Sequence, residues 1–427
     1  MKRRIVITGM GVVTPIGIGI KNVWEASLNG QCGTGEVTLF DARNYQTRIA
    51  AEVKNFEPSA FMLPEVYRKT DRFAQMGIAA AKMAIEDASM RSLLDKPQNN
   101  IPVIIGSGLG GSLFHEEQIF QLLEGKDPRR VLSSSVPRIA PNAVSAYIAM
   151  QFKFHGPNMT ISTACSSGSN AIATAAQLIK SGIADIAVTG GVECPITPFT
   201  YAAYQSLQVL SKGGNGNHTP RPFDKKRDGF VLGEGAGILV LEDLRHAEAR
   251  GAKIYAELLG YASNCGAYHM AAPNPSGEDA AQAIEAALRM AKVDKKDINY
   301  INAHGTATKM NDLCEAKAIG MVFGYTKEGP AVSSTKSQTG HTIGAAGAIE
   351  TILTALAVQN DTAPPNINCE ELDEECMINV IQNKALKTKI RYAISNSFGF
   401  GSNNSVLVFG KVSGLNSLRI AKGSESK

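Results

Sequence analysis

The chain shows the same order of predicted elements twice, and this repetition is the strongest constraint on its fold. In each half, apolar β-branched segments alternate with helical segments, and a glycine-rich loop leads into a final strand, at GFVLGEGAGILVLE and at FGFGSNNSVLVFG. In each half a strand also runs through a small-residue turn into a helix, at TISTACSSGSNAI and at YINAHGTATKMND. This alternation predicts an α/β fold with largely parallel sheets. We expect two duplicated halves, 1–250 and 251–412, and a polar tail at 413–427.

The expected elements can be placed along the chain. We predict strands at 4–13, 101–105, 159–162, 185–189 and 237–241, then at 254–260, 298–303, 331–334, 393–397 and 405–409. We predict helices at 72–88, 166–180, 200–207, 277–291, 311–322 and 344–358. The strands between residues 101 and 241 are short apolar runs, so we expect them to be buried on both faces.

The composition excludes several classes of protein. The 427 residues are 44% hydrophobic and 19% charged, which is typical of a globular chain. The net charge of +4 is too small to indicate nucleic-acid binding, although it permits an acidic partner. Seven cysteines without paired spacing favour a reducing compartment, and we expect a cytoplasmic location. There is no run of about 18 apolar residues that would predict a membrane span. Glycines and a proline interrupt the apolar stretch after MKRR, which favours a first strand over a signal peptide.

A glycine-rich loop, GSGLGG at 106–111, follows the strand at 101–105. It fits the G-x-G-x-x-G pattern of dinucleotide sites, and Asp127 follows it at a suitable distance. However, the loop lies far into the chain, and 113–124 does not lead quickly into another parallel strand. These features favour glycines that line an apolar cavity, with Leu109 as one wall.

Cys165 differs from the other six cysteines in its position. It ends a predicted strand, and a helix begins directly after it. The positive end of a helix dipole stabilises a thiolate, so we expect a lowered thiol pKa. The turn would also present the sulfur at the carboxyl edge of the sheet, where α/β proteins bind ligands. The alternative is a small buried cysteine, which is how we interpret the other six.

His304 and His341 each follow a predicted strand in a glycine- and threonine-rich turn. Taken singly, either could be a surface or capping histidine. Together with Cys165 they can converge at one sheet edge, and two neutral imidazoles can donate hydrogen bonds to a thioester enolate. This indicates carbon–carbon bond chemistry rather than hydrolysis. We expect no metal site, because there is no C-x-x-C or H-E-x-x-H motif, and His115 lies in a polar helical segment.

Three further residues are candidates for the same site. Lys336 precedes His341 in SSTKSQTGH, and Glu350 follows on the next predicted helix, so a buried pair could hold the histidine geometry; a surface pair is the alternative. The loop NSFGFGSNN places Phe400 among glycines, where a backbone N–H could face an oxyanion and the ring could open or close a channel.

These segments together resemble the β-ketoacyl-acyl-carrier-protein synthases, the elongating type II condensing enzymes of the thiolase superfamily. The resemblance extends from residue 3 to about residue 410 and includes RIVITGMGVVTPIG, TACSSG, RPFDKKRDGFVLGEGAG, NAHGTAT, SSTKSQTGHTIGAAGA and NSFGFG. It implies a thiolase-like fold, with two duplicated α/β halves packed as a layered α-β-α-β-α sandwich. It also implies an acyltransferase that condenses malonyl-acyl-carrier protein with an acyl chain on a cysteine, with loss of carbon dioxide, in fatty-acid synthesis.

The resemblance also implies roles for individual residues. Cys165 would be the nucleophile, and His304 and His341 would drive decarboxylation. Lys336 would orient the histidines with support from Glu350, and the N–H groups of Cys165 and Phe400 would form the oxyanion hole. The residues expected to contact the substrate are Thr306 and Thr308 on the phosphopantetheine arm, Leu109 as a limit on chain depth across a dimer interface, and Phe398 and Phe400 beside the acyl pocket.

The implied partners are an acyl carrier protein and a second subunit. No cofactor is expected, because the substrates are carried on the phosphopantetheine of the carrier. Arg68, Lys69 and Arg72 would dock the acidic carrier; a solvated basic face is the alternative. A homodimer is expected, and a heterodimer with a chain-length partner is the alternative.

Two departures from the family pattern bear on the substrate. Ala307 and Lys309 replace the usual Ser and Pro, and Ser402 replaces a usual Gly. The alternative function is therefore a ketosynthase of a specialised polyketide or polyene pathway. A degradative thiolase is disfavoured because NSFGFGSNN lacks a second cysteine, and a non-catalytic chain-length subunit is disfavoured by Cys165. An initiating enzyme that uses acyl-CoA would carry Asn in place of His341.

Overall fold

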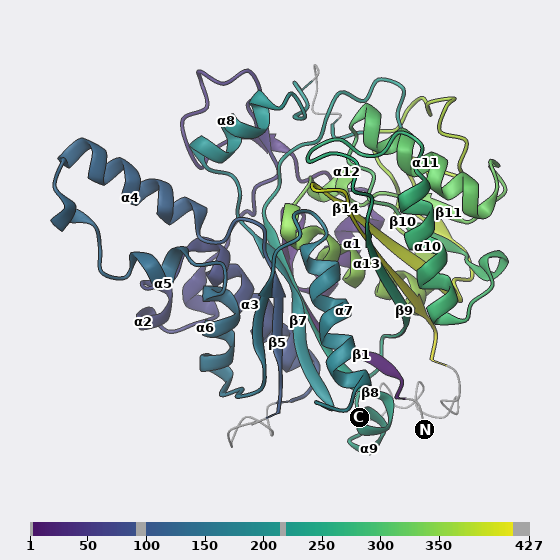
Figure 1. Ribbon diagram of the computed structural model, residues 1–427, viewed down its shortest axis with the longest axis horizontal. Helices are drawn as coiled ribbons and strands as arrows, with labels where there is room; N and C mark the ends of the chain where they lie inside the picture. The colour runs from purple at the N-terminus through teal and green to yellow at the C-terminus, as the bar shows by residue number, and fades with distance from the viewer. Residues whose placement is uncertain (1–2, 91–99, 214–218, 413–427) are drawn as a thin grey trace, which may run out of the picture.

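The structure is a computed structural model that describes residues 3–90, 100–213 and 219–412 (Figure 1). The predicted tail at 413–427 lies outside these residues. Ten strands form the main path of one hydrogen-bonded sheet. Those of the first half are β1 (Ile5–Thr14), β5 (Val103–Gly106), β6 (Asn158–Ile161), β7 (Ile186–Glu193) and β8 (Gly235–Asp243). Those of the second half are β9 (Ala256–Cys265), β10 (Tyr300–Asn302), β11 (Ala331–Ser333), β14 (Tyr392–Gly399) and β15 (Asn403–Gly410).

The two halves share one strand order. The first runs β6-β5-β7-β8-β1 and the second β11-β10-β14-β15-β9, and β1 pairs with β9 where they meet. In chain order, the third, second, fourth, fifth and first strands therefore lie side by side in both halves, which confirms the predicted duplication. A boundary at residue 250 stays a prediction, because the β1–β9 pairing joins the halves into a single sheet.

Two details of the prediction were wrong. Parallel pairing is confined to β6-β5-β7 and β11-β10-β14, and the other ladders are antiparallel, so the sheets are mixed rather than largely parallel. The two strand–turn–helix segments that looked alike are also not equivalent. Cys165 follows the third strand of its half and His304 follows the second strand of the other. A short sequence pattern indicates a turn, but the order of the strands in the sheet depends on pairing between strands that are far apart in the sequence.

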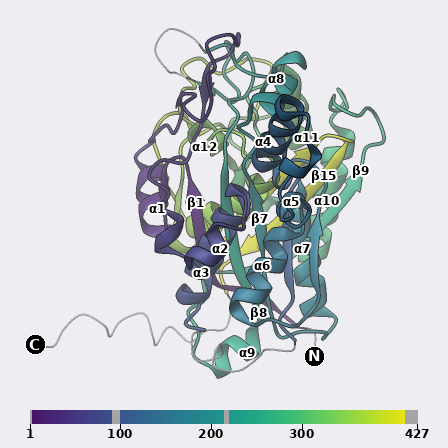
Figure 2. The same cartoon turned by 90° about the vertical axis from the view of Figure 1, so that its left-hand side faces the viewer.

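Helices complete five layers (Figure 1). The middle layer, between the two parts of the sheet, is α7 (Ser167–Lys180) and α13 (Ala346–Asn360). One outer layer is α3 (Arg72–Asp87) with α6 (Ala143–Phe152), and the other is α10 (Glu278–Ala291) with α11 (Lys309–Phe323). The layered α-β-α-β-α prediction is therefore confirmed. Figure 2 looks onto the outer face that carries α3 and α6.

Alternating side chains fill the spaces between these layers. On β8, Leu239 and Leu241 face the middle helices, whereas Ile238 and Val240 face α3 and α6. Burial on both faces is the reason why such strands are apolar at every position. β6 is the exception, because Asn158 and Met159 are exposed. The expectation of burial on both faces was wrong there, at one of the two edges of the sheet.

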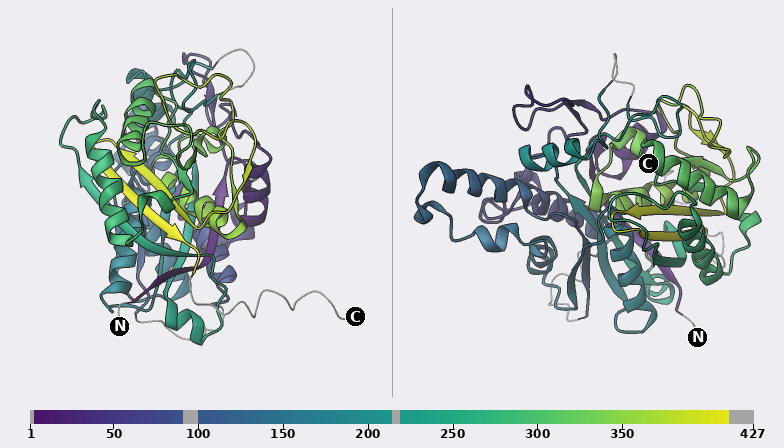
Figure 3. Two further views of the ribbon diagram at one scale, coloured as in Figure 1. Left: turned by 90° about the vertical axis from the view of Figure 1, so that its right-hand side faces the viewer. Right: turned by 45° about the horizontal axis from the view of Figure 1, so that its top comes forward.

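Shorter elements connect the layers. They are the helices α1 (Ile20–Leu28), α2 (Pro64–Tyr67), α4 (Ser112–Gly125), α5 (Ser135–Ile139), α8 (Pro198–Ser206), α9 (Leu244–Ala249) and α12 (Lys336–Thr339), and the strands β2 (Gly17–Ile18), β3 (Gly35–Glu36), β4 (Ile49–Ala50), β12 (Thr362–Ala363) and β13 (Leu386–Lys387). Helix α4 projects from the body (Figures 1 and 3).

One helical stretch, Ile343–Asn360, is long and apolar enough to cross a membrane. Of this stretch 89% is buried inside the protein, where α13 contacts strands of both halves. Its apolar composition is explained by its place in the middle layer.

Candidate active site

Cys165 lies at a sharp elbow between β6 and α7. Ala164 before it has a φ of 51°, a left-handed conformation that turns the chain abruptly. Two serines hold the elbow: Ser166 N–H donates to Thr163 O, and Ser167 Oγ donates to Ala164 O at 2.6 Å. The elbow places the sulfur at the start of the buried helix in the middle layer.

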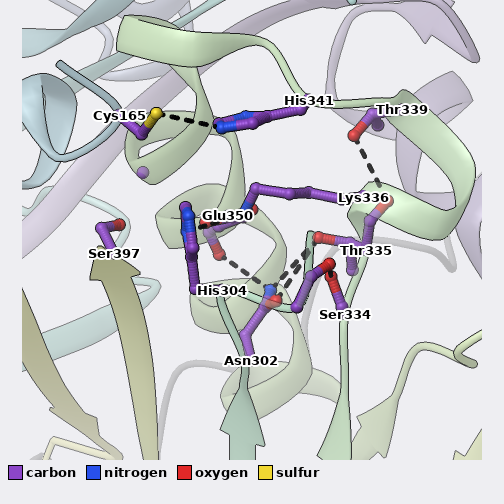
Figure 4. Close-up of polar contacts among 12 residues, drawn as sticks. Cys165, Asn302, His304, Ser334, Thr335, Lys336, Thr339, His341, Glu350 and Ser397 are labelled. Atoms are coloured by element: carbon purple, nitrogen blue, oxygen red, sulfur yellow. Dashed lines mark hydrogen bonds and ion pairs between the residues drawn. The ribbon is translucent and has the colours of Figure 1, made fainter. Parts of the chain in front are cut away.

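His341 lies against this sulfur. Its Nε2 is 3.1 Å from Cys165 Sγ (Figure 4). The other ring nitrogen, Nδ1, accepts a hydrogen bond from the N–H of Ile343 at 3.3 Å. A neutral imidazole with an acceptor at Nδ1 carries its hydrogen on Nε2. The ring therefore presents an N–H donor to the sulfur, and Phe230 packs against it edge to face at 5.1 Å.

His304 follows β10 and is fixed in the same way by a different partner. Its Nδ1 lies 3.2 Å from Lys336 Nζ, and an ammonium group can only donate. Nε2 of His304 therefore carries the hydrogen of the neutral ring. The two histidine rings meet edge to face at 5.4 Å, and both line one cavity with Cys165.

Lys336 also forms a buried ion pair with Glu350 of α13. Both side chains are almost fully buried, so each charge needs the other. Burial raises the pKa of the Glu350 carboxyl to about 7, against the opposing effect of the Lys336 charge. The structure therefore brings together the five polar residues singled out in the sequence, namely Cys165, His304, His341, Lys336 and Glu350 (Figure 4).

Burial decides the charge states of the site. It holds the pKa of His304 and His341 well below the usual value, and the Lys336 charge acts in the same direction. Both rings are therefore neutral at physiological pH. Burial also raises the pKa of the Cys165 thiol to about 12, although Lys336 and the N–H groups of Phe400 and Cys165 lower it. The expected lowering was wrong, because desolvation of the thiolate outweighs the helix terminus and the nearby positive charge.

Phe400 reaches the sulfur through a close approach of two backbones. Its N–H is directed at Cys165 Sγ and favours the thiolate, as does the N–H of Cys165 itself. Gly399, the last residue of β14, lies against the elbow: a Cβ there would lie 3.1 Å from Cys165 N. A side chain at residue 399 would push the two segments apart and move the Phe400 amide.

A cavity of about 820 Å³ opens beside these groups. It is lined by Cys165, both histidines, Thr306, Thr308, Phe398 and Phe400, and by the lysines 212, 225, 226 and 309. The hydroxyls of Thr306 and Thr308 lie 3.0 Å apart. The predicted substrate residues on the second half are therefore placed together on the wall of a single cavity.

Other predicted residues lie elsewhere. The guanidinium of Arg72 bonds Glu234 at 2.6 Å and Val53 O at 3.2 Å inside the protein, which argues against its docking role. Arg68 and Lys69 are exposed at the end of α2. Leu109 is 38% exposed and does not line the cavity. Its role at a dimer interface stays a prediction.

The glycine-rich loop at 106–111 is shaped by a carboxylate inside the protein. The N–H groups of Gly108 and Leu109 donate to Glu193 at 2.6 and 3.0 Å, and Ser107 Oγ donates to it at 3.0 Å. These amides are therefore occupied by an internal acid, which does not suit a dinucleotide phosphate. In the described ranges of the chain, no cluster of three or more His, Cys, Asp or Glu could hold a metal ion.

Sequence reasoning missed two buried acids that shape the site, Glu193 and Glu315. Glu315 on α11 accepts the N–H groups of His304 and Gly305 at 2.8 and 2.7 Å, and Asn396 Nδ2 at 3.1 Å. Burial raises its pKa to about 7. The sequence carries no signal for such a residue, because a helical glutamate looks the same whether it faces water or a strand end.

Comparison with known proteins assigns the chain to a family. The family model "Beta-ketoacyl synthase, N-terminal domain" matches residues 2–247, and its C-terminal counterpart matches residues 255–370. The 3-oxoacyl-[acyl-carrier-protein] synthase 2 of Staphylococcus aureus (strain N315) is 43% identical over 409 residues, which is 96% of this chain and 98% of that one.

Two solved structures share the fold over 96% of this chain and the whole of their own. The ishigamide ketosynthase/chain length factor has a TM-score of 0.91 and 36% identity. A type II polyketide synthase acyl-carrier protein in complex with its ketosynthase, AntDE:AntF, has a TM-score of 0.88 and 32% identity. With both family models, the full-length relatives and a cysteine and two histidines in one cavity, the chain belongs to the β-ketoacyl synthase family.

Proposed function

We propose that this protein is a β-ketoacyl-acyl-carrier-protein synthase, which extends an acyl chain by two carbons with malonyl-acyl-carrier protein in fatty-acid synthesis. The observation that carries the proposal is the arrangement around Cys165. A thiol and two neutral N–H donors line one cavity, and two backbone N–H groups face the sulfur. This arrangement supplies a nucleophile and fixed donors for negative charge on oxygen, without an acid–base pair for hydrolysis.

The first step is acyl transfer to Cys165. Its sulfur attacks the thioester carbonyl carbon of the acyl carrier, and the carbonyl oxygen becomes an oxyanion. The N–H groups of Cys165 and Phe400 stabilise that oxyanion. The bond to the pantetheine sulfur then breaks, and this sulfur leaves with the proton that the Cys165 thiol gives up. The Nε2–H of His341, 3.1 Å from the sulfur, stabilises the charge that develops as the thiol loses its proton.

The second step joins the two carbon units. The bond between the malonyl carboxylate and its neighbouring carbon breaks, carbon dioxide leaves, and the electron pair forms an enolate whose oxygen accepts the Nε2–H groups of His304 and His341. The enolate carbon attacks the acyl carbonyl carbon, and the bond to Cys165 sulfur breaks. The sulfur leaves as a thiolate, which takes up one proton from solvent and restores the thiol. Neutral histidines suit this role, because they donate hydrogen bonds to the enolate without transferring a proton to it.

The substrates need no separate cofactor, because both travel on the phosphopantetheine of a carrier protein. Thr306 and Thr308, on the cavity wall, would contact that arm. The solved ketosynthase bound to its acyl-carrier protein supports a carrier as the partner. We keep Arg68 and Lys69 as the docking residues, since both are exposed. We expect the protein to act in the cytoplasm, where its seven free cysteines stay reduced.

A second copy of the chain would complete the assembly. Strand β6 is an edge strand with Met159 exposed, and the segment between β5 and β6 in the chain carries further exposed large apolar side chains, namely Leu109, Phe120, Leu123 and Val136. An exposed edge with apolar neighbours is typical of an interface. We propose a homodimer through this face; the ketosynthase/chain length factor relative makes a heterodimer the alternative.

Mass spectrometry of Cys165 tests the proposed function. The purified protein is incubated with a panel of acyl-carrier proteins, and acyl adducts on Cys165 are identified before and after addition of malonyl-carrier protein. We expect an adduct that disappears as a product two carbons longer appears on the carrier. No adduct with any carrier, or an adduct released as free acid, would refute the function.

The same panel tests the alternative pathway. The left-handed Ser402 and the cavity-lining Lys309 are where this chain departs from the fatty-acid pattern. Competition between saturated and unsaturated acyl carriers of equal length distinguishes fatty-acid synthesis from a specialised pathway. A preference for saturated chains supports fatty-acid synthesis. A clear preference for unsaturated chains, of the 10- to 200-fold that about 1–3 kcal/mol of altered contacts produces, supports a specialised pathway.

A further inference from the structure

Ser402 joins two segments that both line the cavity. One is the turn between β14 and β15, which carries Phe400, and the other is the segment 266–270 that follows β9. The Ser402 hydroxyl accepts the N–H groups of Tyr268 and His269, both at 3.2 Å, and donates to His269 O at 3.0 Å. A hydroxyl has one hydrogen and two lone pairs, so its capacity is fully used.

The backbone of Ser402 is held in an unfavourable conformation for a serine. Its φ is 57°, in the left-handed region where a Cβ is strained. The residue is only 9% exposed, so the hydroxyl has little access to water in place of its protein partners. A strained, buried residue whose hydroxyl is fully bonded indicates a position that surrounding contacts determine.

The same two segments hold the peptide between Phe400 and Gly401, which directly follows the Phe400 N–H, from both sides. Gly401 N–H donates to Met270 O at 2.7 Å, and Asn403 Nδ2 donates to Phe400 O at 3.0 Å. Gly266 N–H donates to Ser402 O at 2.8 Å. The N–H of Phe400 is then left to face the Cys165 sulfur. The orientation of that amide therefore depends on how firmly the turn is joined to 266–270.

We propose that the Ser402 hydroxyl is a positioning group for acyl transfer: by binding the backbone of 268–269 it holds the Phe400 amide at the Cys165 sulfur. The inference rests on the proposed function, because the amide matters only if an oxyanion forms there. The proposal predicts that loss of the Ser402 hydroxyl affects the two steps of the reaction differently. Acyl transfer uses the Phe400 amide, whereas decarboxylation uses His304 and His341, which Ser402 does not contact.

The test compares both steps in Ser402→Ala, which loses the hydroxyl and keeps the Cβ. We expect the single-turnover rate of acyl transfer to Cys165 to fall about 10- to 100-fold, less than the loss for removing an oxyanion donor outright. Release of carbon dioxide from malonyl-carrier protein should change less than about threefold, because Ser402 contacts neither His304 nor His341. Ser89→Ala is the matched control, since Ser89 also has a positive φ, 54°, and lies after α3 outside the cavity.

A second variant separates the hydroxyl from the backbone strain. Ser402→Gly also lacks the hydroxyl but relieves the left-handed conformation. We expect it to lose acyl transfer as Ser402→Ala does. Full activity in the glycine variant would show that strain, not the hydroxyl, is responsible, and would overturn the proposal. Equal losses in both reaction steps, or none in either, would also overturn it.

Hydrogen exchange tests the contact between Ser402 and residues 268–269 without any substrate. In Ser402→Ala, amides of 266–273 and 399–404 should exchange faster than in the wild type, while those around Ser89 stay the same. If the wild type acylates no carrier, the proposed function fails, yet faster exchange would still show the Ser402 contact. Unchanged exchange would refute the contact whatever the activity.

Discussion

The two halves of the molecule share a strand order but end their corresponding strands differently. After its third strand, β6, the first half turns directly into α7 and places Cys165 at the elbow. After its third strand, β11, the second half first forms the short α12, which begins with Lys336, and only then reaches His341 and α13. The first half therefore supplies a nucleophile at a helix start, and the second supplies donors and the charge that fixes them.

The turns that follow the second strand of each half, by contrast, are built alike. β5 and β10 each end in a turn whose consecutive N–H groups bind one buried carboxylate, Glu193 in the first half and Glu315 in the second. The turn after β10 carries His304, whereas the turn after β5 carries glycines. A duplicated scaffold can thus keep one way of holding a strand end while only one copy carries a catalytic side chain.

Removing the nucleophile gives the largest expected effect. Cys165→Ala should abolish condensation, a loss of at least about 10⁴-fold, because no other thiol faces the two backbone donors. Decarboxylation of malonyl-carrier protein should persist, because the second half is unchanged. Radiolabelled product and carbon dioxide are measured side by side. Continued chain elongation would contradict the assignment of Cys165, in the first half, as the nucleophile.

Removing either donor of the second half should give the reverse pattern. His304→Ala and His341→Ala should each lower decarboxylation by about 10²- to 10³-fold, the size expected for one lost donor to an oxyanion. Cys165 should still become acylated, which intact-mass measurement shows. A variant that decarboxylates normally but cannot be acylated would exchange the roles of the two halves.

Glu315, a buried acid of the second half, should make the free energy of unfolding depend on pH. Burial raises the pKa of Glu315 from 4.5 to about 7. Between these values the folded protein binds a proton that the unfolded chain releases, so the free energy of unfolding is highest at the acid end and falls as the pH rises. Glu315→Gln should remove up to about 3 kcal/mol of this fall.

Urea unfolding at about pH 4.5, 6 and 7.5 measures that difference. Glu124→Gln, at an exposed position of α4, is the control and should follow the wild type. Glu350 titrates in the same direction, and because the Glu315 charge contributes to raising the pKa of Glu350, the change in Glu315→Gln includes a smaller part that comes from Glu350. A Glu315→Gln curve parallel to that of the wild type would show that Glu315 is charged in the folded protein.

Charge reversal on the first half gives the smallest expected effect. Arg68→Glu with Lys69→Glu should raise the KM for the acyl carrier about 10-fold at low salt, and the difference should shrink with added salt because exposed charges are screened. Lys295→Glu with Lys296→Glu, an exposed basic pair on the second half, is the control. Equal effects of the two double variants would mean that docking does not distinguish the halves.

The sequence by itself determined the local elements and the reactive residues. Most predicted strands and helices lie within a few residues of their place, because apolar runs, turn glycines and small-residue elbows act over a few positions. Cys165, His304, His341, Lys336 and Glu350 stood out because each lies next to a strand end or at a fixed spacing from one. The family resemblance then gave them roles that their spacing alone left open.

The tertiary structure decided everything that depends on which segments become neighbours. Arg72 looked like Arg68 and Lys69 until Glu234 was found beside it. The thiol pKa depends on how completely the elbow is buried, and Glu315 depends on which strand end its helix covers. Ser402 was visible as a departure from a pattern, but its bonds to 268–269 exist only because β15 pairs with β9. Burial and long-range pairing arise from the whole chain at once, so no local pattern can encode them.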